Sequence, residues 1–310
     1  MNIYDRYLRY YPANDGKFIA YRLFEPKDYA TANLLFLHGS TLNSLVYIPV
    51  GLRLSSQFRI RTYLIDFRGH GASDGRRGHI DYIGQLENDL SILMQNIKKD
   101  YSHLPLYLGA HCAGASVLTR YLTLEEKVEP DGYIFAAPLI VLKNGISKKT
   151  APGLEQICRI RLGRILFIDF LNALGLRLFN QIRCADFMFP QEVLIRMNTI
   201  IKSYSYHMVK SLNMRHYYHN FKYLNKPTLV ITGNKDKVVC AKEIENVFNI
   251  NIKSNIDKTL QVIEGRDHFS VILDVAKYAG PWIQDRINAV TFFNNKDSDY
   301  QRTTLPYREL

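Results

Sequence analysis

The chain has 310 residues, of which 47% are hydrophobic and 22% are charged, and its formal net charge is +11. This composition is typical of a globular protein with enough apolar side chains for one large domain or two ordinary ones. No window approaches the roughly 18 uninterrupted apolar residues of a membrane-spanning helix. The first twenty residues mix charged and aromatic side chains and do not resemble a secretion signal. These features exclude a bilayer-spanning protein and predict no export.

The cysteines are widely spaced and include no C-x-x-C pair, which argues against a zinc knuckle or a disulfide framework. We expect reduced thiols and a cytoplasmic location. His216 and His219 have i, i+3 spacing but no further ligand candidate nearby, so the sequence predicts no metal site. The cysteines are Cys112, Cys158, Cys184 and Cys240.

In chain order, apolar runs alternate with helical patterns. The run NLLFLHG is almost continuously apolar, as in strands that are buried on both faces of a parallel sheet. Residues 84–101 carry apolar side chains at helical spacing and lead into another apolar run. This alternation indicates the α/β class, with a mostly parallel sheet and helices on both faces. The predicted strands are 17–24, 33–39, 62–67, 105–111, 132–138, 227–233 and 259–265.

The alternation stops after residue 139 and resumes near residue 223. We predict a core formed by 1–139 and 223–292, with a largely helical cap, 140–222, inserted between its two parts. The end of the chain, 293–310, is polar and has no periodicity, so it is predicted to be a flexible tail.

Most of the net positive charge lies in the predicted cap. Between Lys143 and Lys222 there are 13 lysines and arginines against four acidic residues. Segment 159–179, RIRLGRILFIDFLNALGLRLF, alternates arginines with Ile, Leu and Phe, which suits peripheral contact with an anionic membrane surface or an acidic head group. The alternative is a cap helix that packs its apolar side on the core and keeps its arginines in water. Because no nucleic-acid module is present, the charge does not predict nucleic acid binding.

Residues 106–116, LYLGAHCAGAS, place a thiol where an apolar run meets a turn of small residues. Small residues two before and two after Cys112 match the nucleophile elbow, a strand–turn–helix motif usually written G-x-S-x-G. Here Ala110 stands in place of the first glycine, and Cys112 stands in place of serine. A buried structural cysteine is the alternative for this motif on its own.

The other two members of a catalytic triad follow in the chain order expected for an elbow of this kind. Asp236 in GNKDKVV comes just after one late apolar run, and His268 in GRDHF comes just after the next. The neighbouring Asp267 is a poorer acid, because adjacent residues seldom point at each other. We therefore take Cys112, Asp236 and His268 as the candidate nucleophile, acid and base.

Acyl transfer also needs N–H donors where the carbonyl oxygen becomes negative. The turn His38-Gly39-Ser40 follows an apolar run. On its own it could simply be the turn that ends a strand. We expect the backbone N–H groups of Ser40 and Ala113 to form the oxyanion hole. Ala113 would be assisted by the positive end of the helix that begins there.

Together these motifs resemble the α/β-hydrolase superfamily, in the branch of monoacylglycerol lipases, lysophospholipases and serine-aminopeptidase-like hydrolases. The resemblance covers about residues 15–140 and 225–290. It rests on LLFLHGS, DFRGHGASDGRRG, the elbow, GNKD and RDHF. Arg68, His70 and Ser73 match a structural loop of the family, so no catalytic role is expected for them.

The resemblance implies an α/β-hydrolase fold with a mostly parallel eight-stranded sheet and no metal or organic cofactor. It implies that Cys112 is at the nucleophile position, Asp236 at the acid, His268 at the base, and Ser40 and Ala113 at the oxyanion hole. The expected activity is hydrolysis of a small-molecule or lipid-like carboxylic ester through an acyl-enzyme, as in a lysophospholipase or monoacylglycerol lipase.

Cys112 departs from the branch, which has serine at this position, and three accounts compete. The thiol works beside His268 as a thiolate–imidazolium pair, and cysteine in this position resembles dienelactone hydrolases and polyhydroxyalkanoate synthases. Such a thiol would favour thioesters or activated lactones and would also suit a cysteine-dependent acyltransferase or thioesterase. In the second account the thiol is a laboratory replacement of serine. In the third the chain is a catalytically silent ligand-binding protein, which the retained Asp236 and His268 weigh against.

Overall fold

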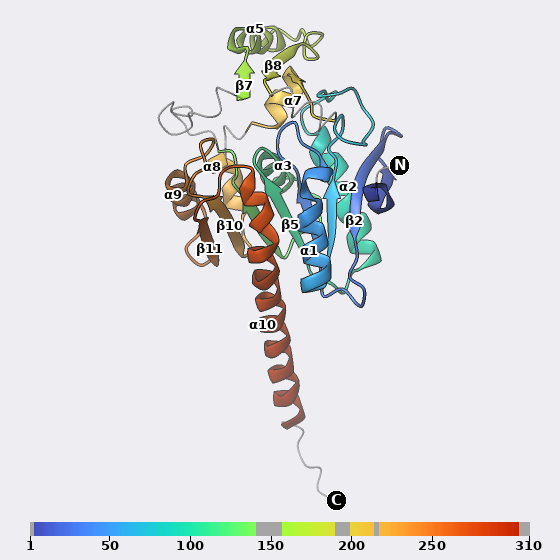
Figure 1. Ribbon diagram of the computed structural model, residues 1–310, viewed down its shortest axis with the longest axis vertical. Helices are drawn as coiled ribbons and strands as arrows, with labels where there is room; N and C mark the ends of the chain where they lie inside the picture. Colours follow the sequence, from blue (N-terminus) through green and yellow to red (C-terminus); the bar gives the residue numbers. More distant parts are fainter. Residues whose placement is uncertain (1–2, 141–156, 190–198, 214–216, 304–310) are drawn as a thin grey trace, which may run out of the picture.

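An eight-stranded sheet runs through the core of the protein (Figure 1). The computed structural model describes residues 3–140, 157–189, 199–213 and 217–303. All seven predicted strands are present, and a short N-terminal strand, which the sequence analysis did not predict, completes the sheet. The strands are β1 (Leu8–Pro12), β2 (Phe18–Phe24), β3 (Ala32–Leu37), β4 (Ile60–Ile65), β5 (Leu106–His111), β6 (Gly132–Ala136), β10 (Thr228–Gly233) and β11 (Lys258–Ile263).

The strand order in the sheet is β1-β2-β4-β3-β5-β6-β10-β11. Every neighbouring pair from β4 to β11 is parallel, whereas β1 pairs with β2, and β2 with β4, in antiparallel register. This topology confirms the predicted α/β-hydrolase fold. Because the carboxyl ends of parallel strands meet at one edge, the loops after β3, β5, β10 and β11 come together there.

The middle strands are buried along their whole length. Every residue of β3, β5, β6 and β10 is buried, in agreement with their continuous apolar runs. Burying each large side chain here, such as Leu34 or Phe36, stabilises the fold by about 1.5–3 kcal/mol. The loops at the carboxyl ends therefore stand on a rigid base.

Helices cover both faces of this sheet (Figure 1). On one face α1 (Ile48–Phe58) packs against α10 (Val275–Thr303), and on the opposite face α2 (Gln85–Asp100) packs against α3 (Gly114–Tyr121). The short helix α8 (Tyr217–Asn220) contacts α3. Helix α9 (Ala241–Asn251) places Phe248 against Phe135 of β6 and against Phe221, just after α8.

The cap lies above the carboxyl-end edge of the sheet (Figure 1). The sequence analysis predicted a largely helical cap, but the described residues of the cap also form strands. Its described residues contain a three-stranded antiparallel sheet, in the order β7-β8-β9. Two of these strands have only three residues, too few for an alternating pattern to show in the sequence. The elements are β7 (Cys158–Ile160), α5 (Leu162–Ala173), β8 (Arg183–Phe187), β9 (Ser203–Ser205) and α7 (Tyr206–Ser211).

The C-terminal helix is longer than expected. Helix α10 continues to Thr303, although the sequence analysis predicted an irregular tail from residue 293. Once a helix is nucleated, each added residue gains a hydrogen bond, so a polar segment without periodicity can extend it. Residues 304–310 lie outside the described part of the chain. Among the described helices, none is both long and apolar enough to cross a bilayer.

Candidate active site

Cys112 lies on the turn between β5 and α3. Its φ angle is 51°, in the left-handed region, which costs a residue with a side chain about 1–2 kcal/mol. The backbone fixes this conformation, because Cys112 N donates to Ala136 O at 3.1 Å and Cys112 O accepts from Leu139 N at 3.1 Å. The thiol is buried, with 8% of the residue exposed. The turn therefore has the strained geometry expected of a nucleophile elbow.

Two glycines let this turn approach the loop after β3. A Cβ atom on Gly114 would lie 2.6 Å from the carbonyl oxygen of His38. A Cβ atom on Gly39 would lie 2.9 Å from the Cβ atom of Cys112. Any side chain at either position would push apart the two loops that carry Ser40 and Cys112.

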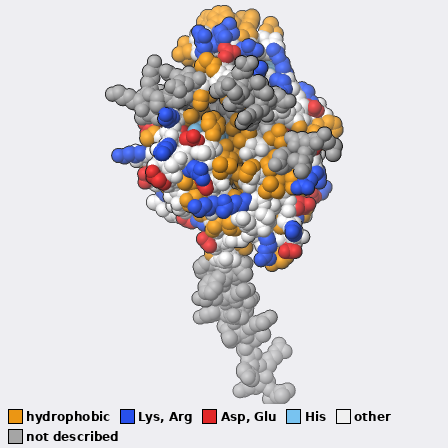
Figure 2. Space-filling view, viewed as in Figure 1, with side chains coloured by type: hydrophobic (Ala, Val, Ile, Leu, Met, Phe, Trp, Pro, Cys, Tyr) orange, Lys and Arg blue, Asp and Glu red, His pale blue; other side chains and the backbone are white. Residues whose placement is uncertain are grey.

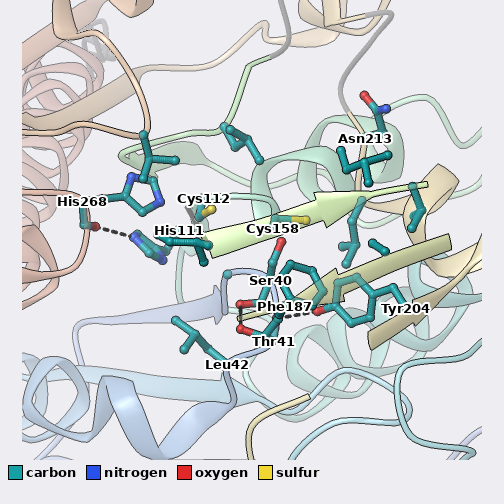
Figure 3. Close-up of a pocket in the computed structure, with 18 of the residues that line it drawn as sticks. Ser40, Thr41, Leu42, His111, Cys112, Cys158, Phe187, Tyr204, Asn213 and His268 are labelled. Carbon is teal, nitrogen blue, oxygen red and sulfur yellow. Dashed lines mark hydrogen bonds between the residues drawn. The ribbon is translucent and has the colours of Figure 1, made fainter. Parts of the chain in front are cut away.

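Asp236 and His268 form a hydrogen-bonded pair beside the thiol. His268 Nδ1 lies 2.8 Å from Asp236 Oδ2, and the two side chains are 4% and 0% exposed. The other carboxylate oxygen of Asp236 accepts from the backbone N–H groups of Val238 and Val239, at 2.7 and 2.9 Å. His268 Nε2 is buried and has no hydrogen-bond partner among the described residues. It lies beside Cys112 (Figure 3).

The charges around His268 favour its protonated form. Burial alone would lower its pKa, but the negative charge of a thiolate at Cys112 and the hydrogen bond to Asp236 outweigh burial and raise the pKa to about 10. An imidazolium facing a thiolate is the activated state of a cysteine nucleophile.

The alternative acid, Asp267, points elsewhere. Its carboxylate accepts from the backbone N–H groups of Phe269 and Ser270, at 3.1 and 2.7 Å. Asp267 therefore shapes the loop that carries His268 and does not bond to the imidazole. In the structure, Asp236 and not Asp267 is hydrogen-bonded to His268.

Two backbone N–H groups near the thiol have no acceptor. Among the described residues, neither Ser40 N nor Ala113 N takes part in a hydrogen bond. Ala113 immediately precedes α3, so its N–H group stands at the positive end of that helix. These two groups have the unpaired donors that an oxyanion hole requires.

His111 and Tyr47 link the loops of the site, and the sequence analysis assigned neither a role. His111 Nε2 lies 2.9 Å from the carbonyl oxygen of His268, which can only accept, so Nε2 carries the proton (Figure 3). His111 Nδ1 then accepts from the Tyr47 hydroxyl at 2.8 Å, and that hydroxyl accepts from Gly39 N at 2.9 Å. Burial and the nearby His268 charge lower the pKa of His111 to about 3, which keeps it neutral.

The loop that follows β4 is structural, as the family resemblance implies. Arg68 forms ion pairs with Asp15 and Asp89, at 2.7 and 2.8 Å. His70 Nε2 lies 2.8 Å from the hydroxyl of Tyr204, which belongs to the cap. Ser73, the third loop residue, donates from Oγ to the backbone oxygen of Asp66 at 2.6 Å.

A mostly apolar cavity, the main pocket, opens above Cys112 between the core and the cap (Figure 3). Its core side contains Ser40, His111, Cys112 and His268. Its cap side is nearly all apolar, so it fits a hydrocarbon chain better than a polar group. The apolar residues from the cap are Ile157, Ile160, Ala185, Phe187, Phe189, Val209 and Leu212.

A second cavity, the side pocket, adjoins the main pocket at His268 and is more polar. It lies between the loop that carries Asp236 and the loop that carries His268. Its residues are Ile157, Lys235, Lys237, Val238, Gly265, Asp267, His268 and Phe269.

The described residues contain no cluster of three or more side chains able to hold a metal ion. His216, one of the two histidines considered above, lies outside the described residues. The four cysteines form no disulfide. A cytoplasmic location stays a prediction.

The family model of Serine aminopeptidase, S33 matches residues 28–271. The chain belongs to this family. The match includes the elbow, Asp236 and His268, and it confirms the resemblance to the α/β-hydrolase superfamily. The expectation of an α/β-hydrolase-type enzyme agrees with it.

Relatives extend this similarity. The chain is 24% identical over 280 residues to an uncharacterized abhydrolase domain-containing protein of Dictyostelium discoideum, covering 88% of this chain but only 28% of that protein. It is 21% identical to a monoglyceride lipase homolog of Monkeypox virus, covering 88% and 96%. Among solved structures, a soluble variant of monoglyceride lipase from Saccharomyces cerevisiae, in complex with a substrate analog, is similar with a TM-score of 0.67 at 17% identity, covering 91% and 94%. That likeness shows the shared fold.

Proposed function

We propose that the protein hydrolyses carboxylic esters with an apolar acyl chain through a covalent acyl-enzyme on Cys112. The observation that carries this proposal is the buried Asp236–His268 pair, with a raised His268 pKa, beside a cysteine on a strained elbow. The monoglyceride lipase names of the relatives point to a lipid-like ester. A protein that only binds a ligand would have no need of this pair.

In the first half-reaction the Cys112 thiolate attacks the ester carbonyl carbon. The carbonyl oxygen becomes negative and is stabilised by the N–H groups of Ser40 and Ala113. His268 then gives its proton to the leaving alcohol as the C–O bond breaks. Once acylated, Cys112 carries no charge, so the strongest influence that raises the pKa of His268 is gone. His268 then takes a proton from water, which attacks the thioester carbon while Asp236 holds the ring. The C–S bond breaks, which releases the carboxylic acid and restores the Cys112 thiolate.

A second candidate function is acyl transfer or thioester hydrolysis, and the thiol itself favours it. A thiolate is a better leaving group than an alkoxide, so the tetrahedral intermediate of a plain ester expels Cys112 more readily than the alcohol. With a thioester substrate both leaving groups are thiolates, so this disadvantage is absent. The same acyl-enzyme would then pass its acyl group to an alcohol or thiol.

Intact mass spectrometry tests the covalent step. The protein is exposed briefly to p-nitrophenyl decanoate and to the matching N-acetylcysteamine thioester, and we expect a gain of one acyl group. Cys112→Ala should show none, and Cys240→Ala, which removes a thiol outside both pockets, should behave as the wild type. Decay of the adduct in water indicates hydrolysis, and persistence until an alcohol is added indicates transfer. No adduct on Cys112 from either compound would refute the proposal.

We also propose that the cap rests on an anionic membrane surface. Helix α5 buries only Ile165 and Ile168, while Leu166, Phe167 and Phe170 are 58–59% exposed. The cap thus presents apolar side chains together with basic ones at the end of the molecule opposite the C-terminal end of α10 (Figure 2). These exposed side chains favour the membrane contact over the alternative, a cap helix that packs its apolar side on the core. Exposed Phe and Leu beside arginines are the composition of interfacial helices.

Vesicle sedimentation tests this contact. We expect binding to vesicles of phosphatidylglycerol and phosphatidylcholine, and weaker binding to phosphatidylcholine alone. Phe167→Ser/Phe170→Ser should reduce binding at least tenfold, because each buried aromatic side chain contributes about 1.5–3 kcal/mol. The control is Leu52→Ser/Ile250→Ser, which removes two exposed apolar side chains from the surface of the molecule outside the cap. Equal loss in both variants, or no binding by the wild type, would contradict the proposal.

A further inference from the structure

The side pocket carries positive charge that is not used within the fold. Lys235 and Lys237 stand on either side of Asp236 in the chain, line this pocket and are exposed. Within the described ranges, no carboxylate forms an ion pair with either ammonium group. Among the described residues that line the pocket, the one carboxylate is Asp267, which accepts from two backbone N–H groups, so the lysines exceed the acidic residues by one charge. The pocket therefore has two free cations beside the base of the triad.

The triad assigns the two pockets to the two halves of an ester, and this step rests on the proposed function. His268 protonates the leaving oxygen, so the leaving alcohol must lie next to His268. The apolar main pocket suits the acyl chain, since it contains both the Cys112 thiol and the Ser40 loop. The side pocket, which shares His268 with the main pocket, is then the place of the alcohol.

We propose that the side pocket binds the phosphate of a phosphorylated alcohol, which is the leaving group of the substrate or the acceptor of the acyl group. Two ammonium groups suit a phosphate better than the neutral hydroxyls of glycerol, because charge-assisted hydrogen bonds are the stronger ones. Lys235 and Lys237 adjoin Asp236, which is 2.8 Å from His268. Because Lys235, Lys237 and His268 line the same cavity, we expect the phosphate to lie only a few bonds from the ester oxygen, as in glycerol 3-phosphate.

Both directions use the same atoms. In hydrolysis, the S–C bond forms at Cys112, the ester C–O bond breaks, and the proton of His268 goes to the oxygen of the phosphorylated alcohol. In transfer, the hydroxyl of the phosphorylated alcohol attacks the thioester carbon, its proton goes to His268, and the C–S bond breaks to restore the thiolate. Neither direction needs an oxidant or a metal ion.

Paired esters test the proposal. We compare kcat/KM for 1-decanoylglycerol and for 1-decanoylglycerol 3-phosphate, which differ only in the phosphate. We expect the wild type to prefer the phosphate ester by about fivefold to thirtyfold, since two partly exposed ion pairs contribute this much, and to lose much of the preference at about 0.5 M salt. Lys235→Gln/Lys237→Gln should abolish the preference, and the ratio cancels any general loss of activity. Lys99→Gln/Lys242→Gln removes equal charge outside the pocket and should keep it.

Two further arms separate the outcomes. Formation of decanoylglycerol phosphate from p-nitrophenyl decanoate and glycerol 3-phosphate would identify the phosphorylated alcohol as an acceptor, and hydrolysis alone would identify it as a leaving group. Glycerol 3-phosphate, but not glycerol, should slow alkylation of Cys112 by iodoacetamide, and this does not require turnover. Turnover of both esters at equal kcat/KM, or no protection of Cys112, would overturn the inference. Absence of any acyl adduct on Cys112 would instead refute the proposed function.

Discussion

The core side and the cap side of the main pocket are built in different ways. On the core side, buried polar groups are held by directional hydrogen bonds, as in the Asp236–His268 pair and the chain from Gly39 through Tyr47 to His111. On the cap side, the walls are apolar side chains from short strands and α7. Hydrogen bonds fix atoms to within a few tenths of an ångström, whereas apolar contacts fix mainly the volume. We therefore expect the core side to determine the chemistry and the cap side to determine which substrate is held above it.

The largest effect on the core side is expected from a substitution of His268. In His268→Ala we expect the alkylation rate of Cys112 at pH 6.5 to fall by about a hundredfold. In the wild type the imidazolium of His268, whose pKa is raised to about 10, lies beside the sulfur, and a neighbouring positive charge makes a cysteine more reactive. His268→Ala removes this positive charge, and cysteines without such a partner react with alkylating agents about a hundredfold more slowly at this pH. The rate is measured with iodoacetamide from pH 5 to 9.

The direction of the pH dependence is part of this prediction. The wild-type rate should be high and nearly level at neutral pH, whereas the His268→Ala rate should rise tenfold for each pH unit up to about 8.5. Asp236→Asn should lie between them, since the hydrogen bond to Asp236 is a smaller cause of the raised pKa of His268 than the Cys112 charge. Identical profiles for wild type and His268→Ala would show that the pair does not ionise the thiol.

Tyr47→Phe should have the next largest effect, because it opens the chain of hydrogen bonds beneath the site. The change leaves Gly39 N and His111 Nδ1 buried without partners, so we expect the free energy of unfolding to fall by about 1–3 kcal/mol. It should also lower kcat about tenfold, since Gly39 adjoins Ser40 and His111 holds the His268 backbone. Urea unfolding and ester kinetics measure the two effects.

A matched tyrosine separates stability from catalysis. Tyr11 is also buried, and its hydroxyl donates to Asp89 O at 2.7 Å, away from both pockets. Tyr11→Phe should lose about 1 kcal/mol of stability with kcat unchanged. If the two variants lose the same stability and neither loses activity, the link from Tyr47 to the site is structural only.

The sequence predicted the core well and the cap less well for a physical reason. Strands such as β3 and β10 are buried on both faces, so their continuous apolar runs are visible in the sequence. The cap strands β7 and β9 have three residues each and are specified by pairing with β8, a contact that is remote in the chain. Helix α10 was predicted too short, because the sequence of its polar end shows no apolar periodicity.

The site divides in the same way. Cys112, Asp236 and His268 could be proposed from the sequence because each follows a strand and carries a reactive side chain, and in the structure the three lie together. Tyr47 and His111 were missed because their importance depends on hydrogen bonds between loops far apart in the chain. The signal that was available is the position of His111, directly before the nucleophile and at the buried end of β5.

We expect Tyr204→Phe to change stability and activity less than the other substitutions do. Tyr204 belongs to the cap and makes hydrogen bonds to the core. Its hydroxyl donates to His70 Nε2 and accepts from Thr41 N, next to Ser40 (Figure 3). Tyr204 and Thr41 line the main pocket, so a water molecule from the pocket can replace the lost hydroxyl. We expect a loss of about 1 kcal/mol in stability and a rise of about threefold in KM for decanoyl esters, with kcat preserved. A tenfold fall in kcat, as in Tyr47→Phe, would instead show that the cap helps to position the oxyanion loop, and the division between chemistry on the core side and holding on the cap side would fail.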